Sequence, residues 1–177
     1  MLNQFKPTWM IESIYNLTPD ELKANGIKAI LTDLDNTLIA WNNPSGTREL
    51  HQWLQQMAAN QIPVIVVSNN NHERVEKAVQ RFDLPFVARA LKPFKTGIKK
   101  ALKEYQLQPD EVVMVGDQML TDVLAANRMN IRSILVKPLM QTDAWNTRIN
   151  RLMERKIQAQ LAKNENFEIQ WRNHLDD

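Results

Sequence analysis

Two aspartates stand one residue apart directly after an apolar segment, and they are the first candidates for chemistry in this chain. The segment 29–31 suits a strand that is buried on both faces, and Asp33 and Asp35 follow it. Two carboxylates at the end of a buried strand are costly unless a cation or solvent meets them. The pattern therefore predicts a positively charged partner at this point.

Polar side chains also follow other strand-like segments later in the chain. They are Ser68 and Asn69 after the segment 64–67, Lys92 after Leu91, and Asp117 after the segment 112–115, with Asp122 five residues later. In an open parallel α/β sheet, ligands bind outside the carboxyl ends of the strands at a topological switch point. We therefore expect these side chains to converge with Asp33 and Asp35 on one site.

Together, these groups predict a phosphoryl-transfer site with a magnesium ion and an aspartyl-phosphate intermediate. Magnesium prefers oxygen ligands and is usually held by one or two carboxylates plus substrate phosphate, and Asp33 and Asp117 would supply the carboxylates. Asp33, whose position the strand fixes, is the expected nucleophile. Asp35 is expected to protonate the departing alkoxide and then to take a proton from the attacking water.

The remaining polar groups are expected to bind the transferring phosphoryl group. Its equatorial oxygens carry negative charge, and Ser68, the neighbouring Asn69 and Lys92 would meet them with donors. Asp122 would lie on the helix after Asp117. We expect it to orient a metal-bound water or the lysine instead of binding the metal directly.

Each of these residues, taken alone, also fits an ordinary structural role. Aspartates favour strand ends and turns, and Ser68 with the asparagines that follow it resembles a helix N-cap region. A receiver-like module that binds magnesium without turnover also places carboxylates, a hydroxyl and a lysine at strand ends. The order of the whole set, and an acid at Asp35 that is poised for hydrolysis, favour an enzyme.

The four segments resemble the four motifs of the haloacid dehalogenase (HAD) superfamily of phosphatases. The matching residues are Asp33, Asp35 and Thr37 for D-x-D-x-T, Ser68 for the hydroxyl motif, Lys92 for the lysine motif, and Gly116, Asp117 and Asp122 for G-D-x-x-x-x-D. The resemblance implies a Rossmann-like sheet, Mg²⁺ dependence and a phosphoaspartate intermediate. It also implies that the backbone carbonyl of Asp35 joins Asp33 and Asp117 at the metal.

The whole chain looks like the YqeG-type branch of HAD subclass IIIA, from the segment 9–14 through 34–38 to 146–151. Members of that branch are similar to phosphatidylglycerophosphate phosphatases, so the resemblance implies this lipid phosphate as substrate. HAD scaffolds hydrolyse many phosphate esters with one shared centre. A soluble sugar, nucleotide or nucleic acid phosphate is therefore the alternative.

Composition fits a globular enzyme and argues against several other classes. A chain of 177 residues with 44% hydrophobic content can bury a core, and a formal charge of +2 gives no case for a nucleic-acid partner. The absence of cysteine fits a reducing cytoplasm, no signal peptide is visible, and no apolar stretch approaches the length of a membrane span. We expect a cytoplasmic protein, in solution or peripheral at the inner face of the membrane.

Helix and strand patterns alternate along the chain, which favours a mostly parallel sheet. We expect an α/β, Rossmann-like three-layer sandwich with five strands. Residues 1–177 would form a single domain with its core at about 27–137. Helices are expected at about 19–23, 47–59, 73–82, 96–105, 120–127 and 142–163, and strands at about 29–33, 64–68, 86–88, 112–115 and 131–136.

The connections between the motifs leave no room for a cap domain. Capless HAD enzymes resemble enzymes that are open to large substrates, such as a headgroup at a membrane, although a neighbouring subunit could also close the site. The sequence leaves the oligomeric state open. Trp41, in the loop after the catalytic strand, is expected either to line the entrance to the site or to anchor the loop.

The expected helix at 142–163 combines an apolar stripe with a basic face. The stripe comprises Trp145, Ile149, Leu152, Met153, Ile157 and Leu161, and the basic residues are Arg148, Arg151, Arg155 and Lys156. Such a helix either packs on the domain with a solvated charged face or touches an anionic lipid surface. Peripheral membrane contact through this helix is thus one expectation.

Overall fold

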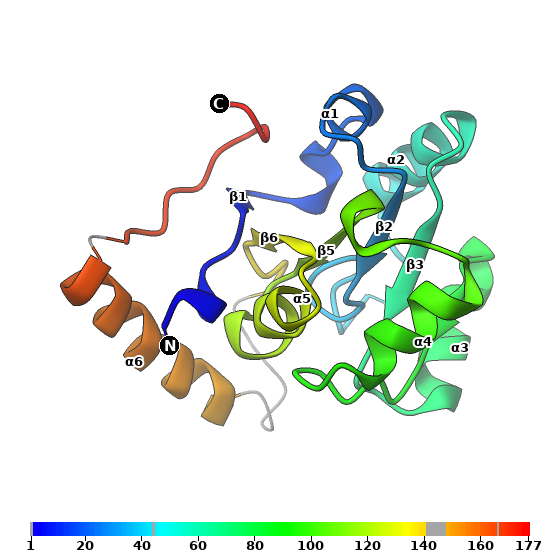
Figure 1. The fold of residues 1–177 in the computed structure, drawn as a ribbon. Helices are drawn as coiled ribbons and strands as arrows, with labels where there is room; N and C mark the ends of the chain where they lie inside the picture. Colours follow the sequence, from blue (N-terminus) through cyan, green and yellow to red (C-terminus); the bar gives the residue numbers. More distant parts are fainter. Residues whose placement is uncertain (1, 44, 141–147, 166) are drawn as a thin grey trace.

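A six-stranded parallel sheet organises the computed structural model, which describes residues 2–43, 45–140, 148–165 and 167–177 (Figure 1). The strands are β1 (Trp9–Ile11), β2 (Ala29–Thr32), β3 (Val64–Val67), β4 (Phe86–Val87), β5 (Val112–Gly116) and β6 (Arg132–Val136). Their order across the sheet is β1-β6-β5-β2-β3-β4. Because β2 lies between β3 and β5, the topological switch point falls at the carboxyl end of β2.

Helices cover both faces of the sheet and complete the three layers. They are α1 (Pro19–Ala24), α2 (Arg48–Ala59), α3 (His72–Val79), α4 (Thr96–Glu104), α5 (Leu124–Arg128) and α6 (Arg148–Glu165). Buried residues of α2 and α3 share one core cluster, and those of α4 and α5 share another. The expected three-layer Rossmann-like sandwich is confirmed.

Successive residues of the central strands point to opposite faces, and both faces are buried. Ile30, Val66 and Val113 belong to the cluster with α2 and α3, whereas Leu31, Ile65 and Met114 belong to the cluster with α4 and α5. A strand covered on both sides needs apolar side chains at every position. This requirement explains why the strands are continuous apolar runs that stop abruptly at polar residues.

The sheet has six strands where the sequence pattern predicts five. The additional strand, β1, pairs in parallel with β6, so that Trp9 lies opposite Ile134. Three residues are too few to show the alternation of a strand, and the sequence pattern alone therefore does not predict it. The helix expected at about 120–127 also differs, because a π-helical turn at Met119–Val123 precedes α5.

The described parts of the connections contain no cap domain, as the sequence predicts. Between β2 and β3 the described residues form a loop and α2. Between β3 and β4 they form α3 and a short 3-10 turn, Gln80–Phe82. The carboxyl end of β2 is therefore not covered by a second domain in the described part of the chain.

The C-terminal helix α6 packs on the domain at the side of β6, through Leu161 and Ile157. By contrast, Leu152 and Met153 are exposed, so the expected apolar stripe is divided between the core and solvent. The beginning of the expected helix, including Trp145, lies outside the described residues. In the described part of the chain, every helix is too short or too polar to cross a bilayer.

Met57 tests the packing of α2 on the sheet, because its side chain is completely buried. We expect Met57→Ala to lower the free energy of unfolding by about 2–5 kcal/mol, since a cavity replaces the thioether. Its exposed neighbour in the helix provides the control, and Gln56→Ala should change the same quantity by less than about 0.5 kcal/mol. Urea denaturation measures both values, and equal effects would contradict the packing of α2.

Candidate active site

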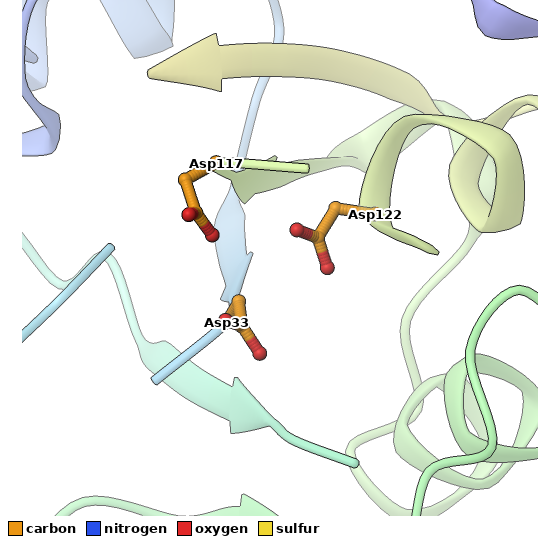
Figure 2. A group of neighbouring side chains, drawn as sticks. All are labelled: Asp33, Asp117 and Asp122. Atoms are coloured by element: carbon orange, nitrogen blue, oxygen red, sulfur yellow. The ribbon is translucent and has the colours of Figure 1, made fainter. Parts of the chain in front are cut away.

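Three carboxylates meet at the carboxyl end of the two central strands, β2 and β5. Asp33 directly follows β2 and its backbone N–H still donates to Val115 O at 2.9 Å, so the sheet fixes its position. Asp117 directly follows β5, and Asp122 lies on the π-helical turn. Figure 2 shows the three side chains converging, and one oxygen from each lies within 4.8 Å of the others.

Lys92 joins two of these carboxylates. Its Nζ donates to Asp33 Oδ1 at 2.8 Å and to Asp122 Oδ1 at 2.7 Å, and its side chain is 2% exposed. Burial by itself would lower the pKa of Lys92, but the negative charges of Asp122 and Asp33 more than offset this and raise it. Lys92 is therefore a buried ammonium that compensates the charge of both carboxylates.

Asp117 is held from two sides by groups that differ in charge. The hydroxyl of Thr37 donates to Asp117 Oδ1 at 3.2 Å, and the guanidinium of Arg151 donates to Oδ2 at 2.5 Å and to the backbone carbonyl at 3.1 Å. Burial raises the pKa of Asp117 to about 8; Arg151 opposes this shift, and the charges of Asp33 and Asp122 add to it. This cluster of carboxylates thus strongly favours additional positive charge.

Asp35 lines the same cavity as Asp33 and Asp117 but has its own hydrogen-bond partners. Arg74 on α3 donates to Asp35 Oδ1 at 2.6 Å, and the amide of Asn70 donates to Oδ2 at 2.5 Å. Burial raises the pKa of Asp35, although Arg74 and Asn70 act in the opposite direction. A carboxyl group with a raised pKa can hold a proton long enough to act as a general acid.

The segment after β3 brings a hydroxyl to the site and also fixes the lysine. Ser68 is 2% exposed, and its Oγ accepts from the backbone N–H of Asn70 at 3.2 Å. The amide of Asn69 accepts from Lys92 N at 2.7 Å and donates to Lys92 O at 2.8 Å. The Asn69 side chain therefore holds the backbone of Lys92. Asn69 also lines the cavity, and its contact with phosphate stays a prediction.

The expected site residues gather around one cavity of about 420 Å³. Those that line it are Asp33, Asp35, Ser68, Asn69, Lys92 and Asp117. Asp122 lies behind them, where it contacts Lys92 and accepts from the backbone N–H of Gln118 at 3.1 Å. Trp41 also lines the cavity and is 41% exposed, which favours a position at the entrance.

Sequence reasoning did not identify Arg74, Asn150 or Arg151 as site residues. Arg74 and Asn150 line the cavity, and Arg151 binds Asp117. In the sequence, Arg74 looks like an ordinary solvent-exposed residue of a helix. Arg151 is one of several arginines on a basic helix, so nothing distinguishes it from the others. Only the packing of α6 against the domain brings Arg151 to the end of β5, and no local spacing indicates that packing.

The donor set fits a magnesium ion. Asp33, Asp117 and Asp122 offer carboxylate oxygens within reach of one cation, and all three come from structure that the sheet holds in place. Burial raises the pKa of Asp117, and the negative charges of Asp33 and Asp122 raise it further, so a cation beside these carboxylates would favour their ionised forms. Asp33 and Asp117 would hold the ion, since they line the cavity at the ends of adjacent strands, whereas Asp122 lies behind them.

Gly116, the last residue of β5, makes this arrangement possible because it has no side chain. A Cβ atom at this position would lie 2.2 Å from the carboxylate carbon of Asp122. Any other residue must therefore push Asp122 away from Lys92. The glycine is required by this close approach.

We expect Gly116→Ala to fold but to lose about 100-fold in phosphate release, because displacement of Asp122 by about 1 Å misplaces Lys92. Hydrolysis of a generic aryl phosphate measures the effect, with circular dichroism as the check on folding. Gly26→Ala is the matched control for alanine at a glycine, since a Cβ there meets nothing within 4 Å; its positive φ gives it a stability cost but no contact with the site. Equal activities of the two variants would contradict the role of Gly116.

Comparisons with known proteins agree with this geometry. The HAD-hydrolase-like family profile matches residues 90–147. The chain is 39% identical over 167 residues to a Bacillus subtilis protein named "Probable phosphatase YqeG". The aligned residues make up 94% of this chain and 96% of the Bacillus subtilis protein.

Solved structures share the fold at low sequence identity. An uncharacterized protein from Listeria monocytogenes serotype 4b has a TM-score of 0.54 at 18% identity, over 66% of this chain and 84% of its own. CbbY from Rhodobacter sphaeroides, solved in complex with phosphate, has a TM-score of 0.50 at 15% identity, over 67% and 90%. Taken with the near full-length match to the Bacillus subtilis protein, these findings show that the chain belongs to the YqeG-type phosphatases of the HAD superfamily.

Proposed function

We propose that this protein is a magnesium-dependent phosphomonoester hydrolase that works through an aspartyl-phosphate intermediate. The observation that carries the proposal is the buried bridge from Lys92 to Asp33 and Asp122, beside Asp117. It presents one fixed carboxylate, Asp33, to a cavity that also contains a second carboxyl group, Asp35, whose pKa is raised by burial. A nucleophile and a separate acid are the two groups that this chemistry needs.

In the first half-reaction, a carboxylate oxygen of Asp33 attacks phosphorus and the ester P–O bond breaks. Asp35 gives its proton to the departing alkoxide. Lys92 and the hydroxyl of Ser68 donate to the oxygens of the transferring group, whose negative charge increases as the bond breaks. The products of this step are the free alcohol and phosphorylated Asp33.

In the second half-reaction, Asp35 is ionised and takes a proton from a water molecule that attacks phosphorus. The bond between phosphorus and Asp33 breaks, inorganic phosphate leaves, and both carboxyl groups return to their initial states. Bound Mg²⁺, held by Asp33, Asp117 and the backbone carbonyl of Asp35, would neutralise charge on the phosphate oxygens. Asp122 keeps Lys92 directed at Asp33 throughout.

Asp33→Asn removes the nucleophile while keeping the size of the side chain. We expect phosphate release to fall by at least about 1000-fold, because an amide does not attack phosphorus. Asp83→Asn is the matched control: Asp83 is exposed, lies outside the cavity, and has a φ of 51°, which asparagine tolerates well. A turnover rate for Asp33→Asn equal to that of the control would show that Asp33 is not the nucleophile.

We further propose phosphatidylglycerophosphate as the substrate, acted on from the cytoplasmic side of the membrane. The absence of a cap in the described residues supports this choice, since a headgroup that remains in a bilayer must reach the site from outside. Arg74, whose side chain is 43% exposed, lines the cavity beside Asp35 and offers a cation to the phosphodiester of this lipid. A soluble phosphomonoester is the alternative substrate.

A substrate panel separates these alternatives. Purified protein is assayed for phosphate release from phosphatidylglycerophosphate in vesicles, from sugar phosphates and from nucleotide phosphates, each with Mg²⁺ and then with a chelator. We expect the lipid to be the preferred substrate and the chelator to stop all release. Preference for a soluble ester would overturn the assignment of the lipid as substrate and nothing else. Phosphate release that continues in the chelator would overturn the proposed dependence on Mg²⁺.

The site also bears on how the chain is organised. Its groups come from β2, β3, β5 and, through Arg151, from α6 near the C-terminal end of the chain. We therefore propose that residues 1–177 work as one catalytic domain. Removing α6 would remove a charge from the site.

A further inference from the structure

Among the described residues, five large hydrophobic side chains are strongly exposed to solvent. They are Trp41 at 41%, Leu91 at 58%, Phe94 at 66%, Leu152 at 59% and Met153 at 48%, and we call them the apolar rim. Scattered exposed hydrophobic residues are normal, but exposure concentrated in one region indicates an interaction site. The positions of these five side chains in the fold decide which of the two cases applies.

Every member of the apolar rim belongs to a segment that builds the active site. Trp41 lines the cavity itself. Leu91 precedes Lys92, and Phe94 follows it by two residues. Leu152 and Met153 come directly after Arg151, which binds Asp117, on the first turns of α6. The exposed apolar side chains therefore belong to the three segments that bring Trp41, Lys92 and Arg151 to the site.

The turn that carries Lys92 is divided between the site and solvent. Lys92 is buried, whereas Leu91 and Phe94 are exposed, and the backbone N–H of Phe94 donates to Leu91 O at 2.8 Å. Leu91 also has a φ of 57°, a conformation that asparagine or glycine would adopt at lower cost. A leucine that is both exposed and strained contributes little to the stability of the fold. Its presence here therefore indicates a role in binding.

Basic residues accompany the apolar rim. The chain has no acidic residue from Leu84 to Lys103, and Arg89, Lys95, Lys99 and Lys100 in this stretch are exposed. On α6, the exposed Arg155 and Lys156 follow Met153, while the acidic Glu154 points inward and is 4% exposed. Exposed apolar side chains flanked by cations match a surface of anionic lipid, with acyl chains inside and negative headgroups outside.

We propose that the apolar rim is the surface by which the protein docks on an anionic bilayer, with the mouth of the active site facing the headgroups. The inference rests on the proposed function and adds its docking surface. It keeps the exposed Leu152 and Met153 of the apolar stripe expected on the C-terminal helix and adds the turn at Lys92 and the loop at Trp41. Ile157 and Leu161 of that stripe pack on the domain, and the exposed contacts come from the turn at Lys92, the loop at Trp41 and the start of α6.

Sedimentation with vesicles tests the proposal without any turnover. The vesicles contain phosphatidylglycerol mixed with phosphatidylcholine in one arm and phosphatidylcholine alone in the other. We expect the protein to bind the first kind and to bind the second much more weakly. The double variant Leu91→Asn with Phe94→Gln should bind the anionic vesicles about tenfold more weakly, because it loses two inserted side chains. Its Tm should be unchanged or higher, since asparagine suits the backbone at residue 91.

Two lysines at opposite ends of α4 provide a matched pair for the charge contribution. Lys95 caps the beginning of the helix beside Phe94, and Lys103 lies in its last turn, on the order of 10 Å away along the axis. That separation is about one Debye length in physiological salt. Lys95→Gln should therefore weaken binding to the anionic vesicles, and Lys103→Gln should leave it near that of the unaltered protein.

The outcomes separate docking from catalysis. Asp33→Asn protein should still sediment with anionic vesicles, and the double rim variant should still hydrolyse a soluble aryl phosphate. Failure of the unaltered protein to bind, or equal binding by the double variant, would overturn the docking surface and leave the phosphatase proposal standing. A concentration-dependent dimer that the double variant abolishes, with no vesicle binding, would instead identify the rim as an interface between copies of this chain.

Discussion

The interaction on which the site depends is the charge compensation of three carboxylates at the carboxyl ends of β2 and β5. Asp33, Asp117 and Asp122 would repel one another in this position without cations. Lys92 forms ion pairs with Asp33 and Asp122, and Arg151 forms one with Asp117. Buried ion pairs contribute little net stability, since desolvation offsets their attraction. Their value here is chemical, because they fix Asp33, the proposed nucleophile, beside carboxylates that could also hold a metal ion.

The rest of the fold can be understood as the means of holding that cluster. The sheet fixes Asp33 and Asp117 at adjacent strand ends, the amide of Asn69 holds the backbone of Lys92, and Gly116 leaves space for Asp122. Asp35 has different partners, Arg74 on α3 and Asn70 in the segment before that helix. These different surroundings allow neighbouring carboxyl groups to differ in protonation, as the proposed nucleophile and acid must.

The sequence predicted the parts that depend on local patterns. Buried strands such as β2 and β3 are continuous apolar runs, and their polar ends marked Asp33 and Ser68. The strand β1 was missed because three residues show no period, and Arg151 was missed because its role arises from contact between segments distant in sequence. The hydrogen bonds between the Asn69 amide and the Lys92 backbone could not be predicted either, since an amide side chain suits a phosphate and a backbone equally well.

The contact between Arg151 and Asp117 gives the C-terminal helix an influence that its position in the chain does not suggest. Any event that bends or shifts α6, whether a bound neighbour or a lipid surface against Met153, would alter the charge around Asp117, the proposed metal ligand. Surface contact and catalytic readiness would then be coupled through a single guanidinium. In such a protein, contact of a neighbour or a lipid surface with the exposed side of α6 would change the rate of turnover.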